Sequence, residues 1–338
     1  MSSVLPDVIA AVMLVALVLY AVLGGADFGG GVWDLAAFGP RAKQQRETIE
    51  HSIAPVWEAN HVWLILIVVL LFTAFPLAWA TASILLHIPL TAMLIGVVLR
   101  GSAFVFRKYD LPGPAERTWG RVFAAGSVIA PFFLGVCLAA ISSGHLTNRD
   151  IGESYAQRYV WPWLGAFPVL VGSFVLVLFA FVAAVYLTVE ADTQQLQDDF
   201  RRRALGSGVV AAVLAIAAAL AGPKVRLPEL PLLIGAALAA AGFTTHALLT
   251  RAYRRARVST VALVAVFIGG WAFGMYPNLI NPGFDLHTSA APEATLKLLV
   301  WALAAGVLVL APSLYALFKV FKRQSLPAQL DPNHQPKA

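Results

Sequence analysis

The chain alternates long apolar runs with short polar connections, and nine of these runs approach the roughly 20 mainly apolar residues that a membrane-spanning helix needs. The polar connections between them are too short to fold as separate soluble domains. The sequence therefore predicts an all-α integral membrane protein with nine transmembrane helices. The predicted helices cover residues 8–26, 54–75, 80–100, 122–142, 161–187, 205–222, 231–250, 258–276 and 296–318.

The ends of the chain differ in character from the apolar runs. The first residues carry no basic cluster, so the first run is predicted to be a retained membrane helix and not a cleaved signal peptide. Pro76 separates the second and third runs, which predicts an antiparallel hairpin. Residues 1–323 are expected to form one polytopic membrane domain, and the polar, proline-bearing stretch 324–338 is typical of a disordered cytoplasmic tail.

Composition supports a membrane protein and charge sets its orientation. Of 338 residues, 59% are hydrophobic and only 12% are charged, which lies outside the range of soluble globular proteins. The net charge of +6 would suit nucleic acid, but the basic residues flank apolar runs, as in membrane topology signals. We expect the N-terminus outside, the C-terminus in the cytoplasm, and no nucleic-acid partner. All Lys and Arg then lie inside except Arg149, Arg158, Lys224, Arg226 and Lys297.

The start of the second predicted helix is the first candidate site. Glu58 and His61 lie within an apolar run and are three residues apart, so on a helix they project from the same face. Ionisable groups inside a membrane are costly and usually face a protein interior or a wet cavity. Alternatively, Glu58 lies at headgroup depth and only marks the helix start. Trp57, beside Glu58, is a candidate contact for a quinone or a lipid.

The sequence places two further charged groups at a similar depth. Asp27 lies in the glycine-rich stretch GGADFGGG near the inner end of the first predicted helix. It is expected either to form a proton relay with Glu58 or to pair structurally with an arginine. Arg100 lies near the inner end of the third predicted helix, where it either neutralises one of these acids or extends to the membrane surface.

The histidines and the single cysteine limit the cofactors that this chain can hold. A b-type haem in a helix bundle needs two axial ligands at matched depth. His61 and His87 are predicted at different depths, whereas depth alone leaves a pair of His61 and His246 open. Cys137 is the only cysteine, which excludes an internal disulfide and a cysteine-based metal cluster. No metal-ligand spacing, nucleophile–base pair or nucleotide motif stands out, so we expect no cofactor bound by this chain alone.

Four motifs occur together in one order along the chain: GGADFGGG, PVWEANHVWLI, FTAFPLAWA and VLRGSAFVFR. In this order and spacing they resemble subunit II of the cytochrome bd-type quinol oxidases. The specific part of the resemblance covers roughly residues 20–110. The predicted helix layout and the MYPNLINP loop extend it more loosely to nearly the whole chain.

The resemblance implies an oxidase of the bacterial cytoplasmic membrane that oxidises quinol and reduces dioxygen to water. The haems (b and d, or b only) and the quinol-oxidising loop are then expected on a partner, subunit I. Subunit II is expected to be haem-free and to form two four-helix bundles with one peripheral helix. It would stabilise subunit I and contribute a proton path from the cytoplasm through an acid at the position of Glu58. A structural quinone near Trp57 is associated with some members, and small accessory subunits are left open.

The sequence also departs from the common family pattern. The helix-two motif often reads WDGNE, so Glu58 replaces an aspartate and His61 replaces an acid. Val105 stands where a glutamate often lies. These changes suggest a divergent or cyanide-insensitive-like branch and leave the detailed proton route open.

Three hypotheses follow from these residues. In the first, Glu58, Asp27 and His61 pass protons toward oxygen chemistry in the partner, and Arg100 sets their charge state. In the second, the same buried acids serve a proton-coupled secondary transporter. In the third, the polar residues only pack and pair within a structural subunit.

Overall fold

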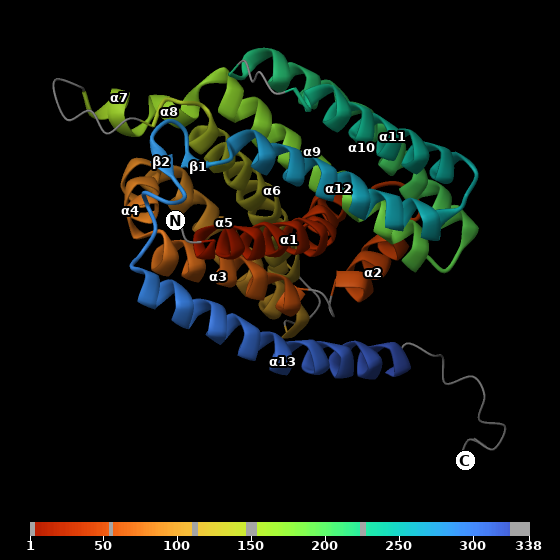
Figure 1. The fold of residues 1–338 in the computed structure, drawn as a ribbon. Coiled ribbons are helices and arrows are strands. Elements are labelled where there is room, and N and C mark those ends of the chain that lie inside the picture. The colour runs from red at the N-terminus through yellow and green to blue at the C-terminus, as the bar shows by residue number, and fades with distance from the viewer. Residues whose placement is uncertain (1–3, 54–56, 110–113, 147–153, 224–227, 325–338) are drawn as a thin grey trace.

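The computed structural model describes residues 4–53, 57–109, 114–146, 154–223 and 228–324, and nearly all of this part is helical (Figure 1). The expected all-α membrane fold is confirmed, with one short antiparallel hairpin of β1 and β2 added. The elements are α1 (Leu5–Leu35), α2 (Ala42–Ile53), α3 (Trp57–Ala74), α4 (Pro76–Leu85), α5 (His87–Tyr109), α6 (Pro114–Ser142), α7 (Tyr155–Tyr159), α8 (Trp161–Leu164), α9 (Ala166–Glu190), α10 (Gln194–Ala221), α11 (Leu230–Leu249), α12 (Tyr253–Met275), β1 (Asn278–Ile280), β2 (Phe284–Asp285) and α13 (Glu293–Gln324).

Within the described residues, eight helices are long and apolar enough to cross a membrane. A ninth crossing exists only if the broken pair of α3 and α4 counts as one span, because α4 is bent by 115° from α3. The break lies at Pro76, which has no N–H to continue the helical ladder. The expected third helix, 80–100, is therefore divided: its first residues belong to α4, and the spanning helix α5 begins at His87 and ends at Tyr109.

The first helix is longer than the 8–26 expected from hydropathy. It continues to Leu35, so the glycine-rich motif lies inside α1 and does not end it. Glycine weakens a helix in water, but inside a bilayer the backbone must satisfy its hydrogen bonds within the helix. Gly29 also lets α9 come close, because a Cβ there would lie 2.0 Å from the backbone oxygen of Phe179.

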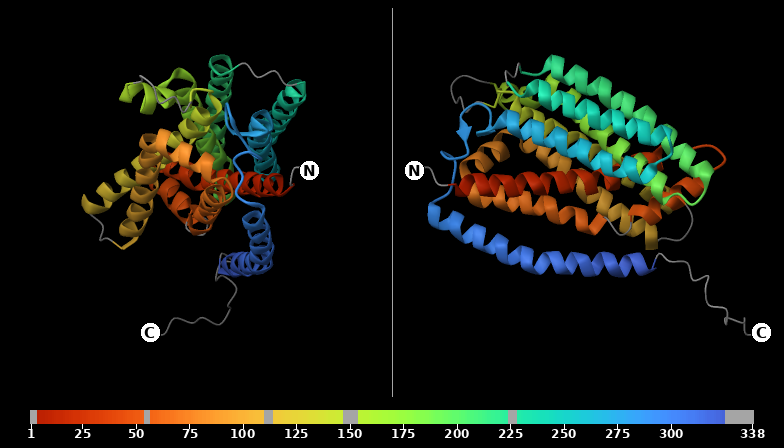
Figure 2. Two further views of the ribbon diagram at one scale, coloured as in Figure 1. Left: turned by 60° about the vertical axis from the view of Figure 1, so that its left-hand side comes forward. Right: turned by 45° about the vertical axis from the view of Figure 1, so that its right-hand side comes forward.

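Helix α1 lies in the middle of the molecule and packs against α3, α6, α9 and α12 (Figures 1 and 2). Around it, α5 packs on α6, α10 on α9, and α11 on α12. Helix α13 runs along the edge of the molecule beyond α3, and the part from Glu293 to Leu310 is only 6% buried. One peripheral helix thus agrees with expectation, while the grouping of the others into two four-helix bundles stays a prediction.

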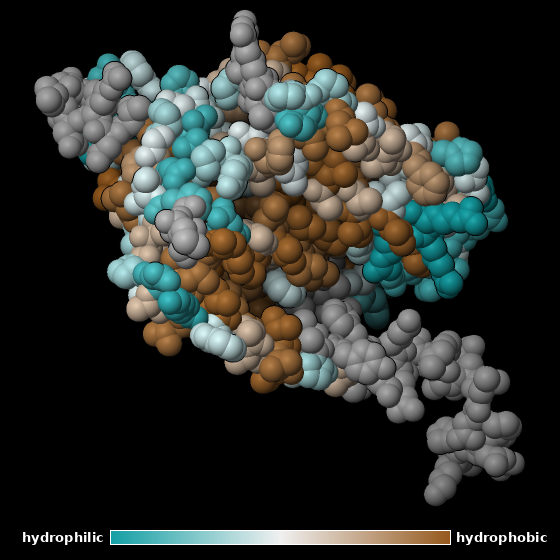
Figure 3. All heavy atoms as spheres, in the orientation of Figure 1, coloured by the Kyte–Doolittle hydropathy of each residue, from teal (hydrophilic) through white to brown (hydrophobic). Residues whose placement is uncertain are grey.

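The outer faces of the helices are apolar. Hydrophobic residues form a broad band across the face in Figure 3, and hydrophilic residues gather toward its two ends. Large exposed apolar side chains include Ile65 on α3, Val213 on α10 and Leu238 on α11. A soluble protein rarely exposes so much contiguous apolar surface, so this band fits the hydrocarbon core of a bilayer.

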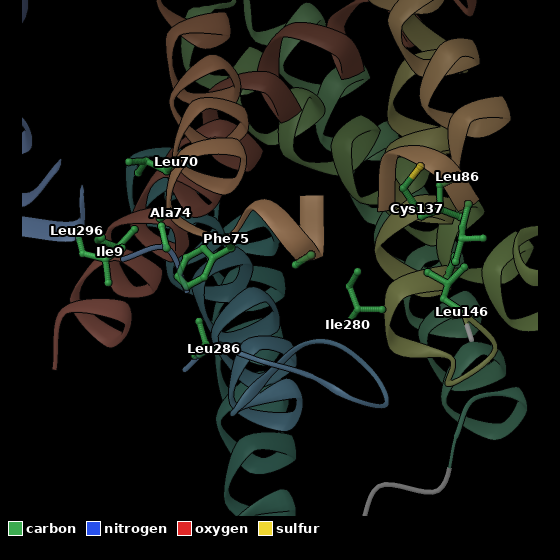
Figure 4. Close-up of a cluster of buried hydrophobic side chains, with 14 residues drawn as sticks. Ile9, Leu70, Ala74, Phe75, Leu86, Cys137, Leu146, Ile280, Leu286 and Leu296 are labelled. Carbon is green, nitrogen blue, oxygen red and sulfur yellow. The ribbon is translucent and has the colours of Figure 1, made fainter. Parts of the chain in front are cut away.

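One end of the molecule, called here the hairpin end, is closed by the β1–β2 hairpin and by α4. Buried apolar side chains from distant segments meet there, including Ile9, Phe75, Leu86, Ile280 and Leu286 (Figure 4). Backbone hydrogen bonds tie the loops to the helices: the Ala291 N–H donates to the Ala74 carbonyl at 2.8 Å, and the Asn281 N–H to the Ile141 carbonyl at 2.9 Å.

The opposite end, called here the arginine-rich end, is covered by the polar helix α2. Arg41 donates to both carboxylate oxygens of Asp199 on α10, at 2.7 and 2.8 Å, and Gln45 donates to the same group at 3.1 Å. The hydrogen bond with Asp199 raises the pKa of Arg41, and the negative charge adds to the effect. Ile49 of α2 is buried against the ends of the spanning helices. Residues 325–338, most of the expected tail, lie outside the described residues.

Candidate functional site

An ion pair lies completely inside the helix bundle between α1 and α5. The side chains of Asp27 and Arg100 are 0% and 1% exposed. The Nη2 atom of Arg100 donates to the carboxylate of Asp27 and, at 3.1 Å, to the backbone oxygen of the same residue. Arg100 therefore neutralises Asp27 and does not extend to the membrane surface. It can do so because α5 continues past Arg100 to Tyr109, which places Arg100 inside the bundle.

The rest of the Arg100 guanidinium is also held by neighbours. Its Nε atom donates to the hydroxyl of Ser127 on α6 at 3.1 Å, and that hydroxyl donates to the Phe123 carbonyl at 2.8 Å. The rings of Phe28 and Phe123 lie 4.7 and 4.9 Å from the guanidinium carbon. The negative faces of aromatic rings favour a cation, so this pocket stabilises a buried positive charge.

A third polar group, Asn60 on α3, completes the cluster. Asn60 is fully buried, and its Nδ2 atom donates to the second carboxylate oxygen of Asp27 at 3.3 Å. Because an ionised carboxylate only accepts hydrogen bonds, the Asn60 amide must turn its nitrogen toward Asp27. Gly24 makes room for this side chain, since a Cβ at Gly24 would lie 2.9 Å from Asn60 Oδ1.

His61 follows Asn60 and lies against the neighbour of Asp27. Its half-buried ring meets the ring of Phe28 edge-on, with 6.4 Å between the centroids. Two predicted site residues, Trp57 and Glu58, belong to the first turn of α3, but their side chains lie outside the described part of the structure. The structure thus brings Asp27, Arg100 and His61 into one region. The functional roles expected for these three residues, and for Glu58 and Trp57, stay predictions.

The other histidines are not brought to this cluster. His246 is exposed on α11, which packs against α12, whereas α3 packs against α1. The pair of His61 and His246 that depth had left open is therefore not assembled. His87 contacts the Ile84 carbonyl oxygen at 2.9 Å and the Tyr155 hydroxyl at 3.3 Å near the hairpin end. Among the described residues, no group of three His, Cys, Asp or Glu side chains could hold a metal ion.

Two residues of the cluster were given no role by sequence reasoning. Asn60 carried a usable signal, because a buried amide inside an apolar run needs a hydrogen-bond partner. Ser127 carried none, since serine is common in membrane helices and often bonds only to its own backbone, as Ser127 also does.

These features define a polytopic, all-helical membrane protein with a neutralised charge cluster in its interior. Comparison with known families gives the next step: the model of the cytochrome bd terminal oxidase subunit II family matches residues 5–321. The chain belongs to this family, and the resemblance drawn from the four motifs is confirmed.

Individual relatives agree with the family. Cytochrome bd ubiquinol oxidase subunit 2 of Bacillus subtilis is 26% identical over 90% of this chain and 92% of its own length. Cytochrome bd-I ubiquinol oxidase subunit 2 of Escherichia coli K12 is 30% identical over 40% of this chain and 35% of its own length. A chain in the solved structure of the bd oxidase from Geobacillus thermodenitrificans shares the fold, with a TM-score of 0.75 and 22% identity, covering 94% of this chain and 99% of that one.

Proposed function

We propose that this chain, a cytochrome bd-type quinol oxidase subunit whose relatives are named as subunit 2 of such complexes, is the haem-free partner of a haem-bearing subunit I. In this proposal it stabilises that subunit and passes protons from the cytoplasmic side to the site where dioxygen is reduced to water. The residues proposed for the proton path are Glu58, His61 and Asp27, with Arg100 setting the charge.

The buried cluster around Asp27 is the observation that supports this proposal. A carboxylate with no exposure to water is expensive in a membrane, and a purely apolar contact would hold the helices together at lower cost. Arg100, Asn60 and Ser127 compensate that cost and keep the carboxylate in one place. Such a group can accept and release a proton while the surrounding dipoles stay fixed.

The proposed transfer involves only proton positions. A proton reaches Glu58 or His61 at the arginine-rich side of α3 and moves to Asp27 on α1. Asn60 and Arg100 hold the Asp27 carboxylate so that one oxygen always faces α3. Two contacts join α3 to α1 here, Asn60 with Asp27 and His61 with Phe28.

Of the histidines, His61 lies against Phe28 of α1, His87 contacts Tyr155 and His246 is exposed on α11. In this proposal the haems, which supply the electron transfer to oxygen, belong to subunit I, as in the family resemblance. A structural quinone at Trp57 and small accessory subunits are further parts of the proposal that follow from the family alone.

The first test replaces Glu58, the acid in the first turn of α3. Glu58→Gln in the intact complex is expected to lower quinol-driven oxygen uptake per haem by roughly a hundredfold, the low end of what one positioned proton-transfer group contributes. The absorption spectrum of the haems should stay unchanged, because the partner holds them. Oxygen uptake is measured with purified complex, normalised to haem content.

The same experiment separates the competing hypotheses. Unchanged turnover per haem with normal assembly would reject a relay through Glu58. Reduced assembly with normal turnover per haem would instead favour a purely structural subunit. A transporter would act without a haem-bearing partner, so purification of the tagged chain without any haem would favour that alternative.

A further inference from the structure

A second carboxylate lies on the same face of α1 as Asp27. Asp27, Gly30, Gly31 and Asp34 are spaced at positions i, i+3, i+4 and i+7, which is one stripe along a helix. All four residues are buried. The two acids are separated by two turns, about 10 Å along the axis, with only glycines between them on this face.

The second acid is paired in the same way as the first. Arg107 on α5 donates to the two carboxylate oxygens of Asp34 at 3.0 and 3.4 Å. Arg107 is two turns beyond Arg100, just as Asp34 is two turns beyond Asp27. Helices α1 and α5 therefore carry two parallel acid–arginine pairs, one in the interior and one near the arginine-rich end. Arg46 of α2 approaches Asp34 more loosely, at 4.0 Å.

The outer pair borders a pocket. The pocket is lined by Asp34, Ile49, Glu50, Phe104, Arg107 and Phe123 and has room for about one water molecule. Glu50, on α2, is exposed and joins the pocket to the surface of the arginine-rich end. Asp34 is 8% exposed, whereas Asp27 is fully buried. A proton from that surface thus meets Asp34 before it can meet Asp27.

The stretch of α1 between the two acids is kept free of side chains. A Cβ at Gly31 would lie 2.1 Å from the Ser127 hydroxyl oxygen, so glycine is required for that hydroxyl to lie against α1. Ser127 in turn bonds to Arg100 of the inner pair, and Phe123, whose carbonyl accepts from Ser127, lines the pocket of the outer pair. A hydroxyl that can both donate and accept therefore lies against α1 at Gly31, a position between the two acids in the sequence.

From this arrangement we propose that Asp34 is the entrance carboxylate of the proton path, taking protons from the pocket beneath α2 and passing them along the glycine stripe, by way of Ser127, to Asp27. The proposal rests on the proposed function, since it needs Asp27 to carry protons. It assigns a transport role to the second acid–arginine pair, and the glycine-rich motif is what allows the connection.

The competing explanation is that the outer pair only clamps α1 to α5. A clamp needs both partners equally, so Asp34→Asn and Arg107→Gln would then disturb the complex to the same extent. A proton carrier needs the carboxylate and not the cation. Asp34→Asn is therefore expected to slow turnover much more than Arg107→Gln.

The experiment measures quinol-driven oxygen uptake per haem of the intact complex in H2O and in D2O. Asp34→Asn should lower turnover by about fivefold or more, equal to roughly 1 kcal/mol in the barrier, and increase the solvent isotope effect. Arg107→Gln should have the smaller effect on both quantities. Asp199→Asn, which removes a paired acid at the same end but off the stripe, is the matched control and should leave both unchanged.

The outcomes distinguish this inference from the proposed function. If Glu58→Gln slows turnover and Asp34→Asn does not, protons enter elsewhere and the inference is wrong while the proposed function survives. Equal losses in Asp34→Asn and Arg107→Gln without a change in isotope effect would show a clamp and also overturn it. If Glu58→Gln and Asp27→Asn both leave turnover unchanged, the proposed function itself fails.

Discussion

At the scale of single residues, the pairing of Asp27 with Arg100 determines how the interior of this protein tolerates charge. Neither side chain reaches water, so each depends on the other and on the few groups that bond to them. Two buried ions are costly to desolvate, and a single remaining ion is costlier still. The pair should therefore respond very differently to the loss of one partner and to the loss of both.

This difference gives a stability prediction. Arg100→Leu alone should destabilise the chain by about 3–5 kcal/mol, because it leaves Asp27 buried without a counter-charge. The double variant Asp27→Leu with Arg100→Leu should recover most of that loss, since two apolar side chains need no partner. The thermal midpoint of the purified complex checks both. A double variant no more stable than the single one would contradict the explanation.

The sequence predicted which ionisable residues lie in the membrane but not how they pair. Asp27 and Arg100 were recognised because a charge in an apolar run is conspicuous. Their pairing was left open, because hydropathy ends the third helix near residue 100, whereas α5 continues to Tyr109. The role of Ser127 could not be predicted, since it depends on the distance between two helices and not on the chemistry of serine itself.

At the scale of helices, glycine decides how closely α1 approaches its neighbours. Gly29 faces the backbone of α9 and Gly31 faces Ser127 of α6, both at distances that no larger residue permits. In a bilayer, helices gain little from burying apolar side chains, so close packing of small residues is a main source of association. The glycines of the motif GGADFGGG therefore allow α1 to pack closely between its neighbours, and the same motif contains the buried carboxylate of Asp27.

A glycine substitution tests this role. Gly29→Ala should strongly reduce the amount of assembled complex, because its Cβ would lie 2.0 Å from the Phe179 carbonyl oxygen and 2.7 Å from the Cβ of Ala183. Gly242→Ala on α11 is the matched control, since nothing lies within 4 Å of its added Cβ. We expect the control to be neutral or to gain up to about 1 kcal/mol from better helix propensity. Haem-normalised yield from membranes and thermal midpoints measure both effects.

Sequence reasoning located most spanning helices but did not predict the short helix α4 that follows α3. Periodicity and length identify apolar helices well, and α11 (Leu230–Leu249) and α12 (Tyr253–Met275) lie close to their expected ranges. Pro76 correctly indicated a break, but a turn and a second short helix share that signal. Only the packing of α4 across the hairpin end distinguishes them.

At the scale of the whole molecule, charge is sorted between the two ends. Arginines gather at the arginine-rich end, among them Arg41, Arg46, Arg107, Arg203 and Arg251, several of them paired with acids. The apolar band lies between the two ends (Figure 3). Basic residues remain on the cytoplasmic side of bacterial membranes. The arginine-rich end is therefore proposed to face the cytoplasm, as the proton path requires.

Orientation is directly measurable. A fluorescent protein fused after Ala338 should fold and fluoresce, because the C-terminus is expected in the cytoplasm. Alkaline phosphatase, which is active only outside the cytoplasm, should be inactive at the same position and active when inserted in the β1–β2 hairpin. The reverse pattern would invert the molecule and would leave Asp34 on the wrong side to receive cytoplasmic protons.

The break at Pro76 has a consequence for how the protein is made. It leaves the carbonyl of Ala74 without its helical partner, and the amide of Ala291, more than two hundred residues later in the sequence, supplies the missing hydrogen bond. A ribosome that has released only the first two-thirds of the chain has not yet delivered that donor. Until synthesis is nearly finished, the Ala74 carbonyl of the nascent chain must therefore be hydrogen-bonded by water or by another protein, such as a chaperone.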